Sequence, residues 1–271
     1  FFVKQNAAYD ITHRDWSSEV CSSDLADMKW TISGSSGLDE TLVFLADGRD
    51  VYAMESLQDG SYQLSRSASW QPGLHTLGDF RQTEPLKALF FPAREFIGRW
   101  NDPSVREPMP ERIIFGVKNC DLSSLGIFDH VFLHGVCEDP YYAEAREKTI
   151  LISTDCSAHL DVCFCPAVGE QPYAKQGFDI NIAATSAGYV FESGSERGER
   201  LLESAQQYLK PAGQELLEVL EGQRAAHYEE LVELSEKHGL KPDTDLRYAV
   251  DTAFESDLWQ DFAEDCVECG A

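Results

Sequence analysis

Four cysteines in the middle of the chain have the residue type and spacing of a metal centre. Cys120 follows one apolar, β-branched run and Cys156 follows another, and the second run continues in the spacing Cys156-x6-Cys163-x-Cys165. Iron binds thiolate ligands, and four thiolates complete a 4Fe–4S cluster. We therefore expect Cys120, Cys156, Cys163 and Cys165 to form one site that holds such a cluster.

The same residues allow other interpretations. Zinc could use the four sulfurs, and a single cysteine is often only a small buried hydrophobic residue. His159 lies inside the loop and could replace one sulfur or be a surface imidazole, and Cys137 has a structural role in this interpretation. The short loop disfavours a disulfide between Cys163 and Cys165. Eight cysteines in a chain of 271 residues with no secretion signal indicate metal or redox ligands rather than disulfides.

Two strand-like runs position the cysteines. Ile113 to Val117 and Thr149 to Ser153 are rich in β-branched residues and end in turn-forming segments. A helix with Asp121 as its N-cap is predicted between them, which favours parallel pairing of the two strands. Ligand sites in α/β sheets gather beyond the carboxyl ends of parallel strands, so the sulfurs should meet there.

The remaining segments complete a mixed α/β pattern. We predict strands at Leu42–Leu45 and Gly188–Phe191, an amphipathic helix over Glu196–Leu209, and one or two solvent-exposed helices over 211–239. The expected fold is an α/β domain with a mixed, partly parallel sheet and flanking helices. The start of a truncated ferredoxin-like module follows it.

The charge of the chain excludes several kinds of partner. It has 47 acidic and 22 basic residues, for a net charge of −25. This balance argues against binding to nucleic acid or to an anionic membrane surface. It fits either simple solubility or attraction to a basic partner. No apolar run of about 18 residues predicts a membrane span, and no G-x-G-x-x-G loop predicts binding of NAD or FAD by this chain.

The N-terminal segment has features of a sequence artefact. The chain starts without an initiator Met, which suggests a fragment of a longer reading frame, and residues 14–25 resemble a translated sequencing adapter. We exclude this stretch from the fold and give Cys21 no function. Residues 14–25 should pack poorly, with Cys21 far from the other sulfurs.

The C-terminal segment contains half of a cluster-binding motif. Cys266-Val-Glu-Cys269-Gly matches the start of the ferredoxin pattern C-x2-C-x2-C-x3-C-P. Cys266 and Cys269 are expected to be cluster ligands, although this chain alone should hold at most one cluster after reconstitution. About eight irons per chain would contradict that expectation. The domain boundaries we expect are 1–27 for the N-terminal fragment, 28–253 for the cysteine-containing domain, and 254–271 for the start of the ferredoxin motif.

Several motifs in this order resemble a known family. Over roughly residues 28–271 the chain is similar to the 4Fe–4S dicluster proteins, which include the beta subunit of nickel–iron sulfhydrogenases and the corresponding subunit of anaerobic sulfite reductase. The matching motifs are Phe-Gly-Val-Lys-Asn-Cys-Asp-Leu (115–122), Asp-Pro-Tyr-Tyr (139–142), the cysteine block of 156–165 with Gly169, Gly-Phe-Asp-Ile (177–180), Leu258-Trp259, and Cys-Val-Glu-Cys-Gly (266–270). The chain departs from the family at Asn119, where Pro or Ala is usual, and at Pro166–Gly169, where Ser-Met-Gly usually follows the Cys-Phe-Cys motif.

The resemblance implies a cytoplasmic electron-transfer subunit without catalytic residues of its own. Such a subunit relays electrons between a flavin- or NAD(P)-binding subunit and a catalytic subunit, which is either a hydrogenase or a sulfite reductase. One alternative is a scaffold that docks a partner and holds structural zinc or no metal. Another is an enzyme that reduces sulfur species at its cysteines.

Overall fold

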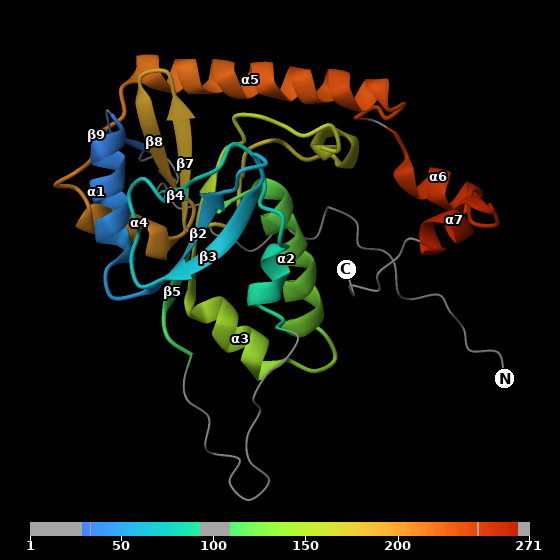
Figure 1. The fold of residues 1–271 in the computed structure, drawn as a ribbon, viewed down its shortest axis with the longest axis horizontal. Helices are drawn as coiled ribbons and strands as arrows, with labels where there is room; N and C mark the ends of the chain where they lie inside the picture. Colours follow the sequence, from blue (N-terminus) through green and yellow to red (C-terminus); the bar gives the residue numbers. More distant parts are fainter. Residues whose placement is uncertain (1–28, 33, 93–108, 243, 265–271) are drawn as a thin grey trace, which may run out of the picture.

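The fold is a mixed β-sheet with helices on both faces (Figure 1). The computed structural model describes residues 29–32, 34–92, 109–242 and 244–264. The expectations for residues 14–25, Cys21, Cys266 and Cys269 therefore lie outside the described residues. No helix among the described residues is long and apolar enough to span a lipid bilayer.

The sheet is parallel at its centre and antiparallel toward both edges. In the described part of the chain its order is β3-β2-β5-β6-β7-β8-β1-β9, with β4 pairing β2. The strands β2, β5, β6 and β7 pair in parallel. The strand bounds are β1 (Lys29–Ile32), β2 (Asp50–Ser56), β3 (Tyr62–Ser67), β4 (His75–Thr76), β5 (Arg112–Val117), β6 (Thr149–Thr154), β7 (Ile180–Thr185), β8 (Gly188–Ser193) and β9 (Lys210–Pro211).

Helices cover both faces because alternate residues of the central strands are apolar. Ile113 and Phe115 of β5 face a core shared with α1 and α4, whereas Ile114 and Val117 face a second core shared with α2 and α3. Helix α5 lies along the edge of the fold over β7 and β8 (Figure 1). The helical segments are α1 (Ser35–Ala46), η2 (Leu86–Leu89), α2 (Asn119–Phe132), α3 (Pro140–Glu147), η3 (Cys165–Val168), α4 (Glu196–Ser204), α5 (Gln214–Lys237), α6 (Leu246–Thr252) and α7 (Leu258–Glu264).

The structure confirms the central strands and corrects one strand prediction. The strands expected at 113–117, 149–153 and 188–191 are β5, β6 and β8. The segment Leu42–Leu45, expected to be a strand, is instead the end of helix α1. Leu38, Leu42 and Leu45 are all buried at helical spacing, and a short apolar run does not distinguish a strand from a buried helix.

Helix boundaries differ from the predicted ones in three places. Helix α2 begins at Asn119 with Lys118 as its N-cap, so Asp121 lies in the first turn and is not the cap. The helix predicted over Glu196–Leu209 ends at Ser204. Residues 214–237 form one helix, α5, with buried Leu220 and Leu231 on its inner face.

Gly116 gives β5 an irregularity just before the first cysteine. The pairing of β5 with β6 shifts register between Phe115 and Val117, and Gly116 has φ +83°. A Cβ at this position would lie 2.8 Å from the Leu77 carbonyl oxygen and 2.8 Å from Cε of Met54. Only glycine fits this bulge, which sets the direction in which the chain approaches Cys120.

We expect Gly116→Ala to lower the free energy of unfolding by at least about 1–2 kcal/mol, the cost of a left-handed conformation for a residue with a side chain. Gly222→Ala is the matched control, because Gly222 lies inside α5 and an added Cβ there meets open space. That control should be neutral or slightly stabilising. Chemical denaturation of both variants measures the difference, and equal stabilities would contradict this role of Gly116.

Candidate metal centre

The four central cysteines come together at the carboxyl ends of two neighbouring parallel strands. Cys120 lies in the first turn of α2 after β5, and Cys156 follows β6, which pairs directly with β5. Cys163 and Cys165 lie in the loop after Cys156, and Cys165 begins η3. This confirms the expected arrangement of β5 and β6 side by side, with both cysteines at the same end.

Electrostatic coupling among the thiols shows that they are close to one another. Burial raises the pKa of Cys120 to about 12, with a further contribution from Asp121 and then Cys156. Burial likewise raises the pKa of Cys156 and that of Cys165 to about 12, and in both cases Cys163 adds to the shift. Each of the four sulfurs therefore interacts with at least two of the others.

The spacing of the sulfurs does not match a preformed site for a single metal ion. Among the described residues, no three of these cysteines have sulfur atoms that all lie within 4.8 Å of one another. Zinc held by thiolates at about 2.3 Å requires neighbouring sulfurs about 3.8 Å apart. The thiols thus share one region without forming the tight group that a lone zinc ion needs.

Lys118 is a buried cation beside the thiols that the sequence analysis did not identify. Its side chain is 0% exposed. Its ammonium group donates to the carbonyl oxygen of Gly78 at 2.7 Å, to Oγ1 of Thr154 at 2.7 Å and to the carbonyl oxygen of Asp155 at 3.3 Å. Burial lowers the pKa of Lys118, whereas Cys156 and the other nearby anionic groups oppose that shift.

The acceptors around Lys118 are neutral, so its charge has no carboxylate hydrogen-bond partner among them. A buried cation without a paired anion is costly, because desolvation penalises the charged form. Anionic thiolates beside Lys118 would offset this cost. The only sequence signal for such a role is the position of Lys118 between a buried strand and Cys120.

Two polar networks hold the loop that carries Cys156, Cys163 and Cys165. The amide of Asn119 donates to Oε2 of Glu170 at 2.8 Å and to the carbonyl oxygen of Gln171 at 3.0 Å. The residue at which this chain departs from the resembled family therefore ties helix α2 to the far end of the cysteine loop.

The second network anchors the start of the loop to α5. Nε of Arg224 lies 2.7 Å from Oδ2 of Asp155, and Arg224 also forms an ion pair with Glu192 of β8. The amide of Asn181 donates to Oδ1 of Asp155 at 2.8 Å. Helix α5, predicted as a solvated helix, also packs against η3. Arg224 was missed because one arginine in a charged helix carries no distinguishing pattern.

We expect the buried thiols of the metal-free chain to resist alkylation at pH 8. The thiolate is the reactive form, and pKa values near 12 leave Cys120, Cys156 and Cys165 almost fully protonated. Exposed Cys137 is the internal control. Peptide mapping after iodoacetamide treatment should show labelling of Cys137 at least about a hundredfold faster than of these three. Equal rates in the folded chain would contradict their burial.

The chain is similar over part of its length to a hydrogenase subunit. It is 30% identical over 161 residues to the sulfhydrogenase 2 subunit beta of Pyrococcus furiosus. The match covers 58% of this chain and 45% of that relative, so the chain spans less than half of the curated protein it matches. No family model matches the chain. The similarity supports a relationship to hydrogenase beta subunits and gives no support to the sulfite reductase alternative.

Proposed function

We propose that Cys120, Cys156, Cys163 and Cys165 hold a 4Fe–4S cluster and that the chain is an electron-transfer subunit of a hydrogenase or sulfur reductase complex. The observation that carries this proposal is the convergence of four coupled thiols beside the buried ammonium of Lys118. When bound, such a cluster accepts and donates one electron at a time.

The charges of the site suit an anionic cofactor. Four thiolates bound to an iron–sulfur cube carry net negative charge, and Lys118 places a fixed positive charge beside them. Arg81 adds a second cation, which lowers the pKa of Cys120. These cations would favour deprotonation of the thiols on binding and would also favour the reduced state, because reduction adds negative charge.

The spacing of the sulfurs favours a cluster over the zinc alternative. A cube of four irons, each bound to one thiolate, keeps its cysteine sulfurs farther apart than a single ion does. The absence of a sulfur trio within 4.8 Å among the described residues fits the larger centre. The networks of Asn119 and Arg224 would hold the ligand loop in one arrangement as charge is gained and lost.

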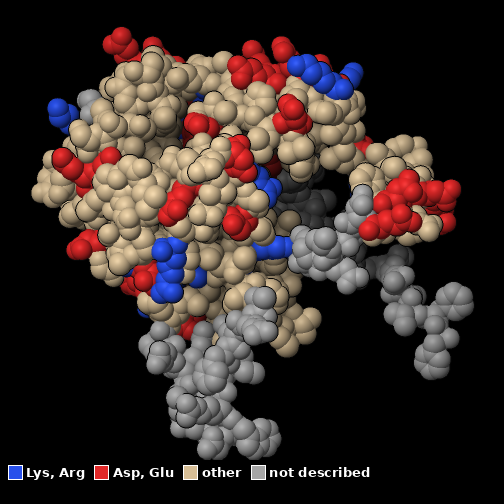
Figure 2. Space-filling view, viewed as in Figure 1, with Lys and Arg blue, Asp and Glu red and all other residues tan. Residues whose placement is uncertain are grey.

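The name of the relative supports a place in a hydrogenase complex. In this proposal the chain is cytoplasmic and passes electrons between a flavin- or NAD(P)-binding subunit and the catalytic subunit. Cys266 and Cys269 would begin a ferredoxin module that takes part in the relay. The surface is consistent with docking to a basic partner, since Figure 2 shows acidic side chains spread over this face and gathered on the segment of α6 and α7.

Cluster assembly tests the ligand assignment. Anaerobic reconstitution of this chain should give about four irons and four acid-labile sulfides per chain, with a brown colour. In Cys163→Ser we expect most of this iron to be lost, because one of four thiolates is missing. Cys137→Ser is the matched control and should keep the parent iron content, because Cys137 is exposed and lies outside the group.

Either of two results would reject the ligand assignment. One is full iron and sulfide in Cys163→Ser, and the other is zinc without sulfide in the parent chain. The second result would favour the zinc scaffold. Reduction of polysulfide by this chain without partners would instead support the interpretation as an enzyme.

Lys118→Met tests the electrostatic role of the buried ammonium. Removing the positive charge destabilises the reduced cluster more than the oxidised one, so the reduction potential should fall. A redox titration followed by electron paramagnetic resonance measures this change, with exposed Lys241→Met as the control. An unchanged potential in a Lys118→Met protein that retains its iron would show that Lys118 does not compensate the charge of a cluster.

A further inference from the structure

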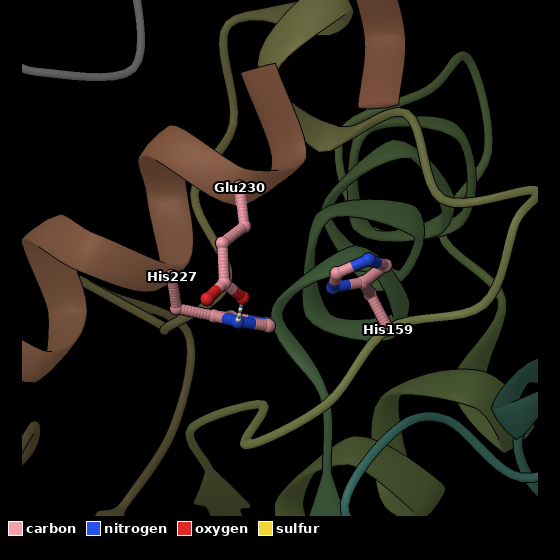
Figure 3. A group of neighbouring side chains, drawn as sticks. All are labelled: His159, His227 and Glu230. Carbon is pink, nitrogen blue, oxygen red and sulfur yellow. Dashed lines mark hydrogen bonds and ion pairs between the residues drawn. The ribbon is translucent and has the colours of Figure 1, made fainter. Parts of the chain in front are cut away.

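Two histidines and a glutamate form a second group of potential metal ligands outside the cysteines. His159 comes from the loop after β6, whereas His227 and Glu230 lie one helical turn apart on α5 (Figure 3). Each residue offers one ligand atom, and these atoms all lie within 4.8 Å of one another. Nδ1 of His227 lies 3.2 Å from Oε2 of Glu230, and the two imidazole rings have centroids 5.4 Å apart.

Two ring nitrogens of this group are buried without a hydrogen-bond partner. They are Nδ1 of His159 and Nε2 of His227, within the part of the chain that the structure describes. A buried polar nitrogen that makes no hydrogen bond costs free energy, and such groups in native proteins usually have a role or a partner. The pairing of His227 with Glu230 on one helix explains neither of these atoms nor the approach of His159 from a distant segment.

We propose that His159, His227 and Glu230 bind a divalent transition-metal ion of the zinc class. Imidazole nitrogen and carboxylate oxygen are ligands that zinc prefers, and two histidines with one glutamate form a known zinc donor set. This site is independent of the proposed cluster, because it uses nitrogen and oxygen atoms and none of the sulfurs.

The group needs only a small closure to bind the ion. Ligands about 2.0–2.1 Å from zinc stand about 3.4 Å apart in a tetrahedral site. The present upper limit of 4.8 Å must therefore shrink by up to about 1.4 Å. Glu230 can supply this movement, since its side chain is 62% exposed.

The ion would link α5 to the loop of the cluster ligands and would face a cavity. His227 and Glu230 line a cavity of about 260 Å³ that Cys156, Tyr173 and Arg224 also border. Three protein ligands leave a fourth coordination position for water or a small ligand, as in open zinc sites. The ion would reinforce the Arg224–Asp155 contact, which joins the same two segments.

Zinc titration of the cluster-loaded full chain tests the site. Calorimetry should show one zinc per chain bound by the parent, with affinity at least about tenfold weaker in His227→Ala and in Glu230→Gln. His134→Ala and Glu233→Gln are matched controls, since both residues are exposed and lie outside the group. X-ray absorption at the zinc edge should show nitrogen and oxygen neighbours at about 2.0–2.1 Å and none of the sulfur neighbours expected at about 2.3 Å.

Each other outcome overturns the proposal. No zinc binding, zinc bound by sulfur only, or parent affinity in His227→Ala would each do so. Iron and sulfide are measured in the same samples, so failure of the cluster assignment is seen separately. If no cluster forms, titration of the metal-free chain with two equivalents of zinc still separates the sites, because only the nitrogen- and oxygen-bound ion should be lost in His227→Ala.

Discussion

The buried ammonium of Lys118 constrains the whole centre. It lies where β5 passes into α2, and it joins three segments through hydrogen bonds to Gly78, Thr154 and Asp155. A charge in that position requires compensation, because its transfer from water to the interior costs several kcal/mol. The thiols of Cys120 and Cys156 are the groups nearby that can become anionic on binding a metal. The fold thus brings together a fixed positive charge and a set of thiols that are protonated until they are occupied.

The surrounding fold explains how these groups stay in place. Parallel pairing of β5 and β6 brings two strand ends together, and the Gly116 bulge sets the path of the chain into the first cysteine. Asn119 and Arg224 fix opposite ends of the ligand loop. Buried polar networks of this kind specify one arrangement when every member is satisfied. This rigidity is useful in an electron carrier, because little reorganisation then accompanies the change of charge.

The sequence predicted the parts of this design that depend on local pattern. The β-branched runs of 113–117 and 149–153 identified the two strands, and the turn residues after them placed the cysteines at one edge of the sheet. It did not predict the burial of Lys118 or the contact of Arg224 with Asp155, because both depend on tertiary packing between distant segments. The apolar run Leu42–Leu45 was interpreted as a strand because its helical partner Leu38 was not considered. The approach of His159 to His227 was likewise invisible, since helix α5 reaches that loop only in the folded chain.

The most direct test of the central claim is anomalous X-ray diffraction at the iron edge from crystals of the anaerobically reconstituted chain. The account predicts one compact iron peak among the sulfurs of Cys120, Cys156, Cys163 and Cys165, next to the ammonium of Lys118. A zinc signal at that position with no iron, or iron bound elsewhere while the four sulfurs remain free, would contradict it.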